Sequence, residues 1–445
     1  MELAKAIKGG TLELICPEME LLVCPSYHES ALKGSGLIRS DDMGRLYFRM
    51  ISPFSARGTR HRSLFGSKPI GELYAPEDHV MLRASDENGD EWRSNPLRID
   101  LSKQIPVSGY HVRSNVFSIS RSRERKETDR SSVRILIPGV PELPFDMFTE
   151  DRRSVAGREI GSSSSLDRHE HTIGAATVIF RRGEDGFLSM SAFQDEPFLP
   201  TWPGLMCHAL GFAVAQTMFP VVIGREFKDR EDLSLHSGPF WRYSSLMHSP
   251  VPFTDLQGRR DFWRLVQLFF SYVEKQQIEP NPLLDELEGV RRGSQGSLQT
   301  ACLTLAVGIE SVAKLLLHDE FSPLVSRPSI EPLMKLLDSW QGDVALKERA
   351  RGALSRLMDV GAADLMYAWA EKAGAADKEL VDAWKKLRHP RAHGERLTQE
   401  SGWIRYCSAV ELLHRLVAYA VGYDGPILRT SQPGWGLQPP FITAH

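Results

Sequence analysis

Hydrophobic and polar positions follow two different periods in the two halves of the chain. Through the first half, short runs that alternate or are wholly apolar recur between turn-forming segments such as Asp86-Glu87-Asn88-Gly89-Asp90. A period of two residues between such turns is typical of β-strands. The strands predicted in this way span residues 11–15, 45–50, 79–83, 133–137, 176–180 and 187–193, with a hairpin connection at 183–186. We expect them to form a β-rich sandwich or barrel-like domain with long loops.

Two segments of the first half have no such period. Residues 118–132 are dense in Arg, Ser, Glu and Lys, and residues 151–168 contain four consecutive serines. Because few apolar groups are present to bury, both segments are predicted to be disordered. The basic run at 121–126 is interpreted either as a disordered solvated face or as an arm that binds RNA.

From about residue 259 the apolar positions recur at helical spacing. Helices are predicted at residues 259–275, 299–317, 330–340, 344–360, 362–373, 376–387 and 399–421. Residues 277–297 are polar and hold Pro280 and Pro282, so they are predicted to be a linker. The last helix carries apolar residues at i, i+3 and i+4 spacing, which suits one face of a helical bundle.

Together these patterns predict an α+β fold with separate β and α parts. At roughly 100 to 200 residues per domain, a chain of 445 residues holds two or three domains. We assign residues 1–255 to a β-rich sensor or recognition domain and 256–296 to a helix and linker. Residues 297–425 form the helical bundle and 426–445 a C-terminal tail.

Composition narrows the classes of protein. The net charge of −3 excludes a histone-like polycation, so any contact with nucleic acid must come from a local basic patch. The five cysteines are odd in number and form no C-x-x-C pair, which favours reduced thiols in a cytoplasmic protein. The uncharged stretch 197–224 is long enough to span a membrane but is broken by prolines. We predict a buried helix at 205–218, a strand at 221–223 and no membrane contact.

Candidate chemistry lies between the last two helices. The helix at 376–387 is followed by Arg388-His389-Pro390-Arg391-Ala392-His393, and Pro390 is expected to end it. An arginine offers a planar cation for phosphate oxygens, and a histidine can exchange a proton near neutral pH. An arginine followed by a histidine after four to six residues also occurs at Arg230/His236 and Arg242/His248, but only Arg388/His393 lies between strong helices.

Residues 387–394 resemble the arginine-to-histidine signature of HEPN-domain ribonucleases, in particular the ApeA-like branch of bacterial anti-phage defence. Residues 305–313 are similar to the first long helix of that domain, with Glu310 on an inward face, and residues 421–426 are similar to its end. The resemblance covers about the last 150 residues, and His389 stands where the family often has asparagine or aspartate. It implies an abortive-infection endoribonuclease without metal or cofactor, acting as a homodimer with a composite site.

Within this resemblance, Arg388 and His393 are the catalytic residues and Glu310 and His389 support them. His393 is general base or acid, and Arg388 stabilises the charge that develops on the phosphate. Glu310 either orients Arg388 or forms an exposed pair with Lys314. His389 binds phosphate, shuttles a proton or merely precedes the proline. The basic residues around the motif bind RNA or complement a helix dipole: Lys385, Lys386, Arg391 and Arg396.

Two other functions stay open. In one, a catalytically silent HEPN-like module dimerises or binds a nucleotide while the β-rich part recognises a ligand. In the other, the protein binds a carbohydrate or another ligand and the helices only oligomerise. Under the ribonuclease hypothesis the partners are RNA, with tRNA as one candidate, and a phage-derived or small-molecule trigger at the first 255 residues. No metal site is predicted, since His169-Glu170-His171 is too short a cluster.

Overall fold

The chain folds into two compact units. The first comprises Met1–Cys207 and Met218–Arg242, and the second comprises His208–Thr217 and Tyr243–His445. Residues 208–217 and 243–255 therefore belong to the second unit, not to the β-rich part that was expected to extend to residue 255. The computed structural model describes residues 1–24, 29–53, 79–99, 101, 109–126, 130–139, 142–155, 158–183, 186–238, 245–278, 280–320, 327–356, 361–392, 399–431 and 437–438.

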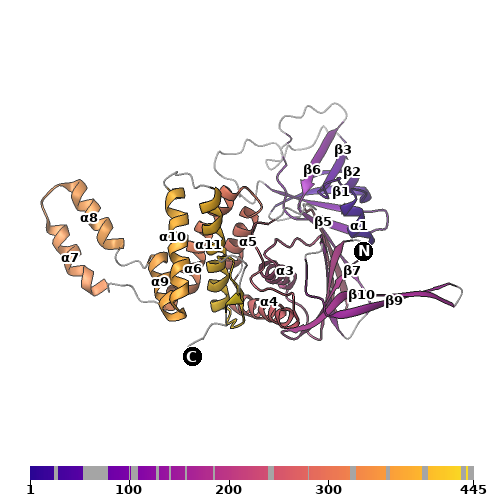
Figure 1. Cartoon of the computed structure of the whole chain (residues 1–445). Coiled ribbons are helices and arrows are strands. Elements are labelled where there is room, and N and C mark those ends of the chain that lie inside the picture. Colours follow the sequence, from indigo (N-terminus) through magenta and orange to yellow (C-terminus); the bar gives the residue numbers. More distant parts are fainter. Residues whose placement is uncertain are drawn as a thin grey trace. The chain divides into compact units, whose positions relative to one another are not determined.

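The described strands of the first unit form one antiparallel sheet of 14 strands. Its order is β6-β3-β2-β1-β4-β5-β7-β14-β13-β8-β12-β11-β10-β9, so β6 and β9 are its ends (Figure 1). Hydrogen bonds thus join the strands in one open sheet instead of the two sheets of a sandwich. The strands are β1 (Glu13–Val23), β2 (Ser30–Ser40), β3 (Leu46–Ser52), β4 (Val80–Ser85), β5 (Glu91–Ser94), β6 (Tyr110–Val116), β7 (Ser118–Glu124), β8 (Ser131–Pro138), β9 (Met147–Val155), β10 (Arg158–Ile173), β11 (Ala176–Arg182), β12 (Phe187–Gln194), β13 (Val222–Glu226) and β14 (Arg230–His236).

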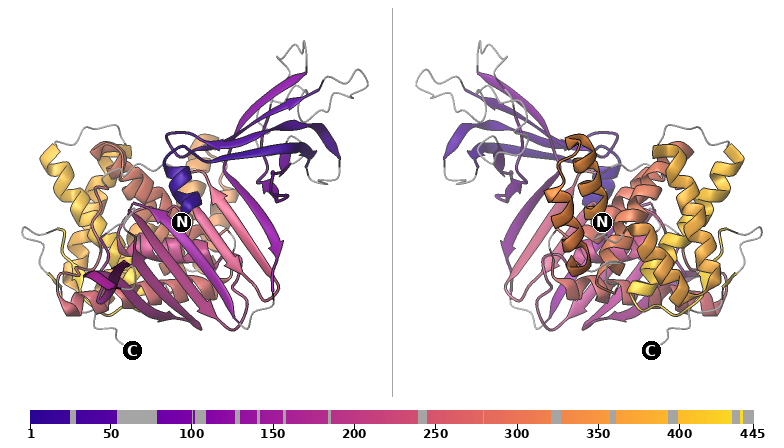
Figure 2. Two further views of the ribbon diagram at one scale, coloured as in Figure 1. Left: turned by 90° about the vertical axis from the view of Figure 1, so that its right-hand side faces the viewer. Right: turned by 90° about the vertical axis from the view of Figure 1, so that its left-hand side faces the viewer.

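Alternation along the strands builds the core of this unit. In β3, Leu46, Phe48 and Met50 are buried, while Arg49 and Ile51 are exposed. The short helix α1 (Glu2–Lys8) adds Ala4 and Ile7 to the same core. Figure 2 shows that the sheet twists strongly, so the indigo strands of its first part turn away from the magenta strands.

Most of the described residues in the two segments predicted to be disordered lie in strands, so that prediction was wrong. Residues 118–124 are β7, which pairs with β5 and β14. Residues 151–155 lie in β9 and residues 158–168 in β10, and these two strands pair with each other. The charges of β7 are neutralised from elsewhere in the unit: Arg121 and Arg123 both bond Asp90. The excess of charge in this segment does not prevent a strand, because a distant carboxylate and the neighbouring strands stabilise it.

The uncharged stretch becomes α3 (Trp202–Ala213) and β13, in agreement with the predicted helix and strand. The helix is five residues shorter than predicted at its end. Ala215 adopts a left-handed backbone conformation, with φ of 54°, which cannot continue an α-helix.

The second unit is helical, so the two units together have the predicted α+β class. Figure 1 shows α6 among α9, α10 and α11, and α6 contacts these three helices and α5. The elements are α4 (Leu256–Gln276), α5 (Pro282–Gly293), α6 (Leu298–Leu317), the 3-10 turn η2 (His318–Glu320), α7 (Arg327–Ser339), α8 (Val344–Arg356), α9 (Ala362–Ala373), α10 (Ala375–Ala392), α11 (Gln399–Ala420), β15 (Ile427–Leu428) and β16 (Leu437–Gln438).

Helix α5 occupies the segment that was predicted to be a linker. Asn281 caps it by accepting hydrogen bonds from the backbone N–H groups of Leu283 and Leu284, and Pro282 stands at its first position. A proline there loses no intrahelical hydrogen bond, so it starts a helix instead of preventing one. Leu287 and Val290 then bury the apolar face of α5.

Helix α6 with its following turn, Leu298–Glu320, is the one helix among the described residues that is long and apolar enough to cross a membrane. Half of its most apolar window is buried inside the protein. Since α6 is the helix around which the bundle packs, this burial accounts for its composition.

Candidate functional site

The predicted partners Glu310 and Arg388 meet between α6 and α10. The Trp384 indole N–H donates to the Ala306 carbonyl over 2.9 Å, and one turn later Arg388 Nη2 lies 2.7 Å from Glu310 Oε2. The Arg388 guanidinium also lies over the Trp384 ring, 5.8 Å from its centre. The two contacts are four residues apart on each helix, so together they fix the position of α10 along α6.

Glu310 holds two cations, one on each oxygen. Lys314 Nζ lies 3.2 Å from Glu310 Oε1, so the exposed helical pair exists alongside the pair with Arg388. The Glu310 side chain is 23% exposed, whereas that of Arg388 is 50% exposed. Because a guanidinium carries five N–H donors, Arg388 can keep its bond to Glu310 and bind an anion from solvent at the same time.

Helix α10 does not end at Pro390 but continues to Ala392, so the predicted helix end was wrong. A proline inside a helix has no N–H for the carbonyl four residues earlier, here that of Lys386. The Arg405 guanidinium of α11 donates to this carbonyl over 3.1 Å. A side chain from the neighbouring helix thus replaces the missing backbone hydrogen bond.

The other end of α10 is attached to α11 by a buried ion cluster that the sequence analysis missed. Arg415 Nη1 lies 2.5 Å from Asp377 Oδ1, and Arg415 Nη2 lies 2.6 Å from Glu411 Oε1. Asp377, Glu411 and Arg415 are each 1% exposed. Burial raises the pKa of Asp377, while the Arg415 cation opposes that shift. The available signal was a Glu/Arg pair at i,i+4 within the apolar stripe of α11.

The predicted RNA-binding and supporting residues are only partly described. Lys385 is exposed and its ammonium lies 5.1 Å from the centre of the Tyr367 ring, and Lys386 is exposed one position later. Tyr367 donates to Asp382, and burial and this carboxylate raise the pKa of Tyr367 to about 12. His389 and Arg391 contribute backbone to α10, and His393 and Arg396 lie outside the described residues. The Arg388–His393 geometry therefore stays a prediction.

Another histidine of the same bundle is sealed from solvent. His414 on α11 is 1% exposed, and neither ring nitrogen has a hydrogen-bond partner in the part of the chain that the structure describes. Burial lowers its pKa to about 3, so its ring is neutral at pH 7. Its ring packs edge-on against Phe212, with centres 5.8 Å apart. This histidine belongs to the core and cannot reach a substrate.

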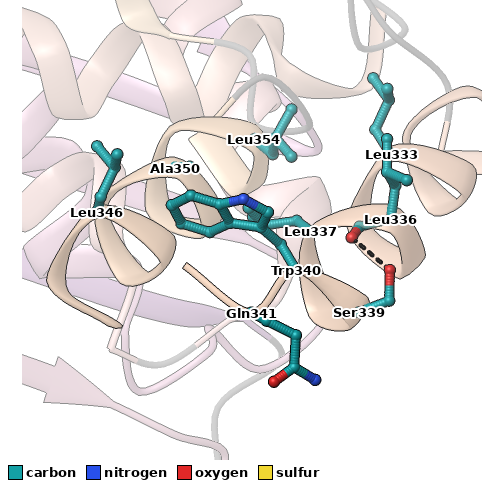
Figure 3. A pocket seen from close by; sticks show the side chains of 9 residues that line it. All are labelled: Leu333, Leu336, Leu337, Ser339, Trp340, Gln341, Leu346, Ala350 and Leu354. Atoms are coloured by element: carbon teal, nitrogen blue, oxygen red, sulfur yellow. Dashed lines mark hydrogen bonds between the residues drawn. The ribbon is translucent and has the colours of Figure 1, made fainter. Parts of the chain in front are cut away.

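The described lining of the cavity between α7 and α8 holds no side chain suited to catalysis. It has a volume of about 810 Å³, and Figure 3 shows Trp340 among leucines of both helices. Its described lining is Leu333, Leu336, Leu337, Ser339, Trp340, Gln341, Leu346, Ala350 and Leu354. None of these side chains titrates near neutral pH, so the described lining offers packing and no acid–base chemistry.

Among the described residues, no three His, Cys, Asp or Glu side chains are grouped so that they could hold a metal ion. Comparisons of the chain with protein-family models, with curated proteins and with solved structures find no match.

Proposed function

We propose that this protein is a metal-independent endoribonuclease whose catalytic residues are Arg388 and His393. The observation that carries the proposal is the state of Arg388: Glu310 fixes the guanidinium at 2.7 Å, yet half of the side chain stays exposed. A positioned, solvent-facing arginine beside a histidine-bearing segment is suited to phosphodiester chemistry. The resemblance of residues 387–394 to HEPN-domain ribonucleases supports the same reaction.

In the proposed reaction a ribose 2′-oxygen attacks the adjacent phosphorus while one histidine takes the 2′-hydroxyl proton. The bond from phosphorus to the 5′-oxygen breaks, and a second histidine donates a proton to the leaving oxygen. Arg388 stabilises the charge on the non-bridging oxygens. The products are a 2′,3′-cyclic phosphate and a 5′-hydroxyl, and DNA is not cut because it lacks the attacking hydroxyl.

The need for two histidines suggests a homodimer, because each chain brings one His393. Helix α6 offers a suitable surface beside Glu310. Leu303 and Val307 precede Glu310 at i−7 and i−3 on one helical face, and they are 50% and 52% exposed. Two copies that pair along this stripe would bury it and bring both motifs into one composite site.

The biological setting is proposed on the family resemblance. An RNA-cutting enzyme of an abortive-infection defence acts in the bacterial cytoplasm and is held inactive until a phage-derived trigger or small ligand appears. The β-rich first unit is the proposed sensor. The exposed Lys385 and Lys386, with Arg391 and Arg396, would contact the RNA backbone.

The test is incubation of the purified protein with tRNA and total RNA in EDTA, followed by sequencing of the cut ends. We expect cleavage with cyclic phosphate ends, its loss in His393→Ala, and a severe loss in Arg388→Lys because an ammonium cannot offer a planar two-pronged contact. Glu310→Gln should be intermediate, since an amide oxygen still accepts from Arg388.

Lys314→Ala is the matched control, because Lys314 bonds the other oxygen of Glu310 and leaves the Arg388 contact in place. It should cut at nearly the parent rate. Parent-like cleavage by Arg388→Lys, or cleavage that requires added magnesium, would overturn the proposed mechanism. RNA binding without any cleavage would identify the bundle as a silent binding module instead.

A further inference from the structure

The outer face of β3 and β6 sets two arginines directly opposite each other. Arg49 of β3 is the cross-strand partner of Arg113 of β6, and both side chains are exposed. Like charges at directly opposed positions of an antiparallel pair destabilise a sheet. This pair of arginines lies on an exposed surface, where any polar residue would fit. Because the pair lowers the stability of the sheet, we expect another interaction to compensate for it.

Part of the compensation is a shared aromatic ring. The Arg113 guanidinium lies 4.9 Å and the Arg49 guanidinium 5.7 Å from the centre of the Tyr47 ring. Each such contact is worth about 0.5–1 kcal/mol at an exposed site. The two guanidiniums cover the ring, which is only 9% exposed. Tyr47 therefore holds both cations at one point of the surface.

No carboxylate of the described residues neutralises either cation. The nearby Arg39 on β2, cross-strand partner of Tyr47, differs because Glu13 of β1 forms an ion pair with it. The chain as a whole carries a net charge of −3, so this concentrated positive charge is local. An anionic ligand would relieve the repulsion between Arg49 and Arg113.

Aliphatic side chains lie beside these cations on the same face. Ile51 follows Arg49 at i+2 and is 54% exposed, and Leu37 of β2 is the cross-strand partner of Arg49. Ile15 of β1, opposite Leu37, is 46% exposed. A surface that combines guanidinium planes with open apolar groups matches an unpaired nucleotide, which presents a phosphate and an exposed base face.

We propose that this surface, defined by Leu37, Tyr47, Arg49, Ile51 and Arg113 and here named the arginine face, binds single-stranded RNA. Arg49 and Arg113 bind backbone phosphates, and bases lie against Ile51 and Leu37. The choice of RNA as the ligand rests on the proposed function, whereas the charge and the apolar groups are independent of it. Strand β6 is the end strand of the sheet among the described strands.

The test measures binding of the full chain to a labelled, 2′-O-methylated 20-nucleotide single strand, which lacks the attacking hydroxyl and cannot be cut. Fluorescence anisotropy over a series of salt concentrations should give an affinity at least about tenfold lower for the variant with Arg49→Ala and Arg113→Ala. Its salt slope should fall by about 1.4, because each phosphate contact to a single strand contributes about 0.7.

The matched control is the variant with Arg181→Ala and Arg182→Ala in β11. It removes the same charge from exposed positions of the same sheet, including a guanidinium 5.3 Å from the Phe145 ring. Its affinity should change less than about twofold. A third variant, with Arg49→Lys and Arg113→Lys, should keep the parent salt slope, because it retains two charges that contact phosphates.

Parent-like affinity in the folded Arg49/Arg113 variant, or an equal loss in the Arg181/Arg182 variant, would overturn the proposal. Arginine-dependent binding of poly-glutamate with no binding of the oligonucleotide would also overturn it and indicate an acidic protein partner. Failure of the ribonuclease function is distinguishable, because it abolishes cleavage of ordinary RNA while leaving arginine-dependent binding of the methylated strand in place.

Discussion

The Arg415 guanidinium lies in the bundle core between two carboxylates, and all three groups are nearly solvent-free. We predict that Arg415→Leu lowers the free energy of unfolding by about 3–5 kcal/mol, because two buried carboxylates lose their cation. Arg351→Leu is the control, since Arg351 pairs with Asp338 at a site where both are about half exposed, and it should cost less than about 1 kcal/mol. Denaturant unfolding measures both. Equal losses would contradict the assigned role.

His414 should make the bundle sensitive to acid. Its pKa is lowered to about 3 in the folded protein, from an ordinary value of 6.5. Between these values the unfolded state binds the proton and the folded state does not, so stability falls as the pH falls. One such group costs about 2 kcal/mol between pH 7 and pH 5.

We therefore predict that His414→Phe loses less stability over this pH range than the parent does. Phenylalanine keeps the ring contact to Phe212 and has no proton to bind. Unfolding midpoints in denaturant at pH 7 and pH 5 give the difference. An unchanged pH dependence would mean that the ring is already protonated or solvated in the folded protein.

At the residue scale, the positions of side chains on a helix could be predicted from the sequence, whereas contacts between distant helices could not. The pair of Glu310 with Arg388 could be predicted because helical periodicity placed Glu310 on the apolar face of α6, where a carboxylate requires a charged partner. The partner of Arg415 on α10 could not be predicted in this way. Asp377 is 38 positions away, and only the packing of α10 against α11 brings it near.

At the scale of elements, the α5–α6 contact depends on a glycine. A Cβ at Gly308 would clash with the Cγ2 atom of Val290 in α5. We predict that Gly308→Ala costs about 1–3 kcal/mol, because a valine in a helix has little rotamer freedom to move away.

Gly289→Ala in α5 is the matched control. Nothing lies within 4 Å of its Cβ position, so the substitution should stabilise the protein by about 0.4–1 kcal/mol. Thermal or denaturant unfolding should therefore move in opposite directions for the two glycines. Destabilisation by both would show that a cause common to the two positions, and not the contact with Val290, decides the result.

The wrong predictions at this scale have one physical cause. Pro282 and Pro390 were treated as helix breakers and the charges of residues 118–124 as a source of disorder, all from local rules. Each was overridden by a partner: the Asn281 cap, the Arg405 guanidinium and the Asp90 carboxylate. Long periodic elements needed no such partner, and α9 and α11 match their predicted ranges closely.

For the whole molecule, the proposed composite site makes activity depend on assembly. We predict that Leu303→Glu converts the proposed dimer to a monomer and abolishes RNA cleavage, because it places a charge within the exposed apolar stripe of α6. Leu303 is half exposed, so the fold should tolerate the change. Sedimentation and cleavage assays at matched concentrations test both effects.

Leu336→Glu serves as its control, because Leu336 is 68% exposed on α7, away from the stripe. It should leave the oligomeric state and the cleavage rate at the parent level. A Leu303→Glu variant that stays dimeric and active would remove α6 from the proposed interface. Loss of the dimer in both variants would show that the loss is not specific to the stripe on α6.

Helix α10 has an attachment at each end and along its side. Arg415 and Arg405 tie it to α11 through Asp377 and the Lys386 carbonyl, while Ala306 and Glu310 of α6 hold Trp384 and Arg388. Because of these contacts, α10 can neither shift along its axis nor rotate about it without breaking several hydrogen bonds and ion pairs at once. Arg388 should therefore keep the same orientation in the resting and the active state of the proposed ribonuclease. If the proposed activity is regulated, the regulation would have to act on access to Arg388, because the described contacts fix the orientation of α10.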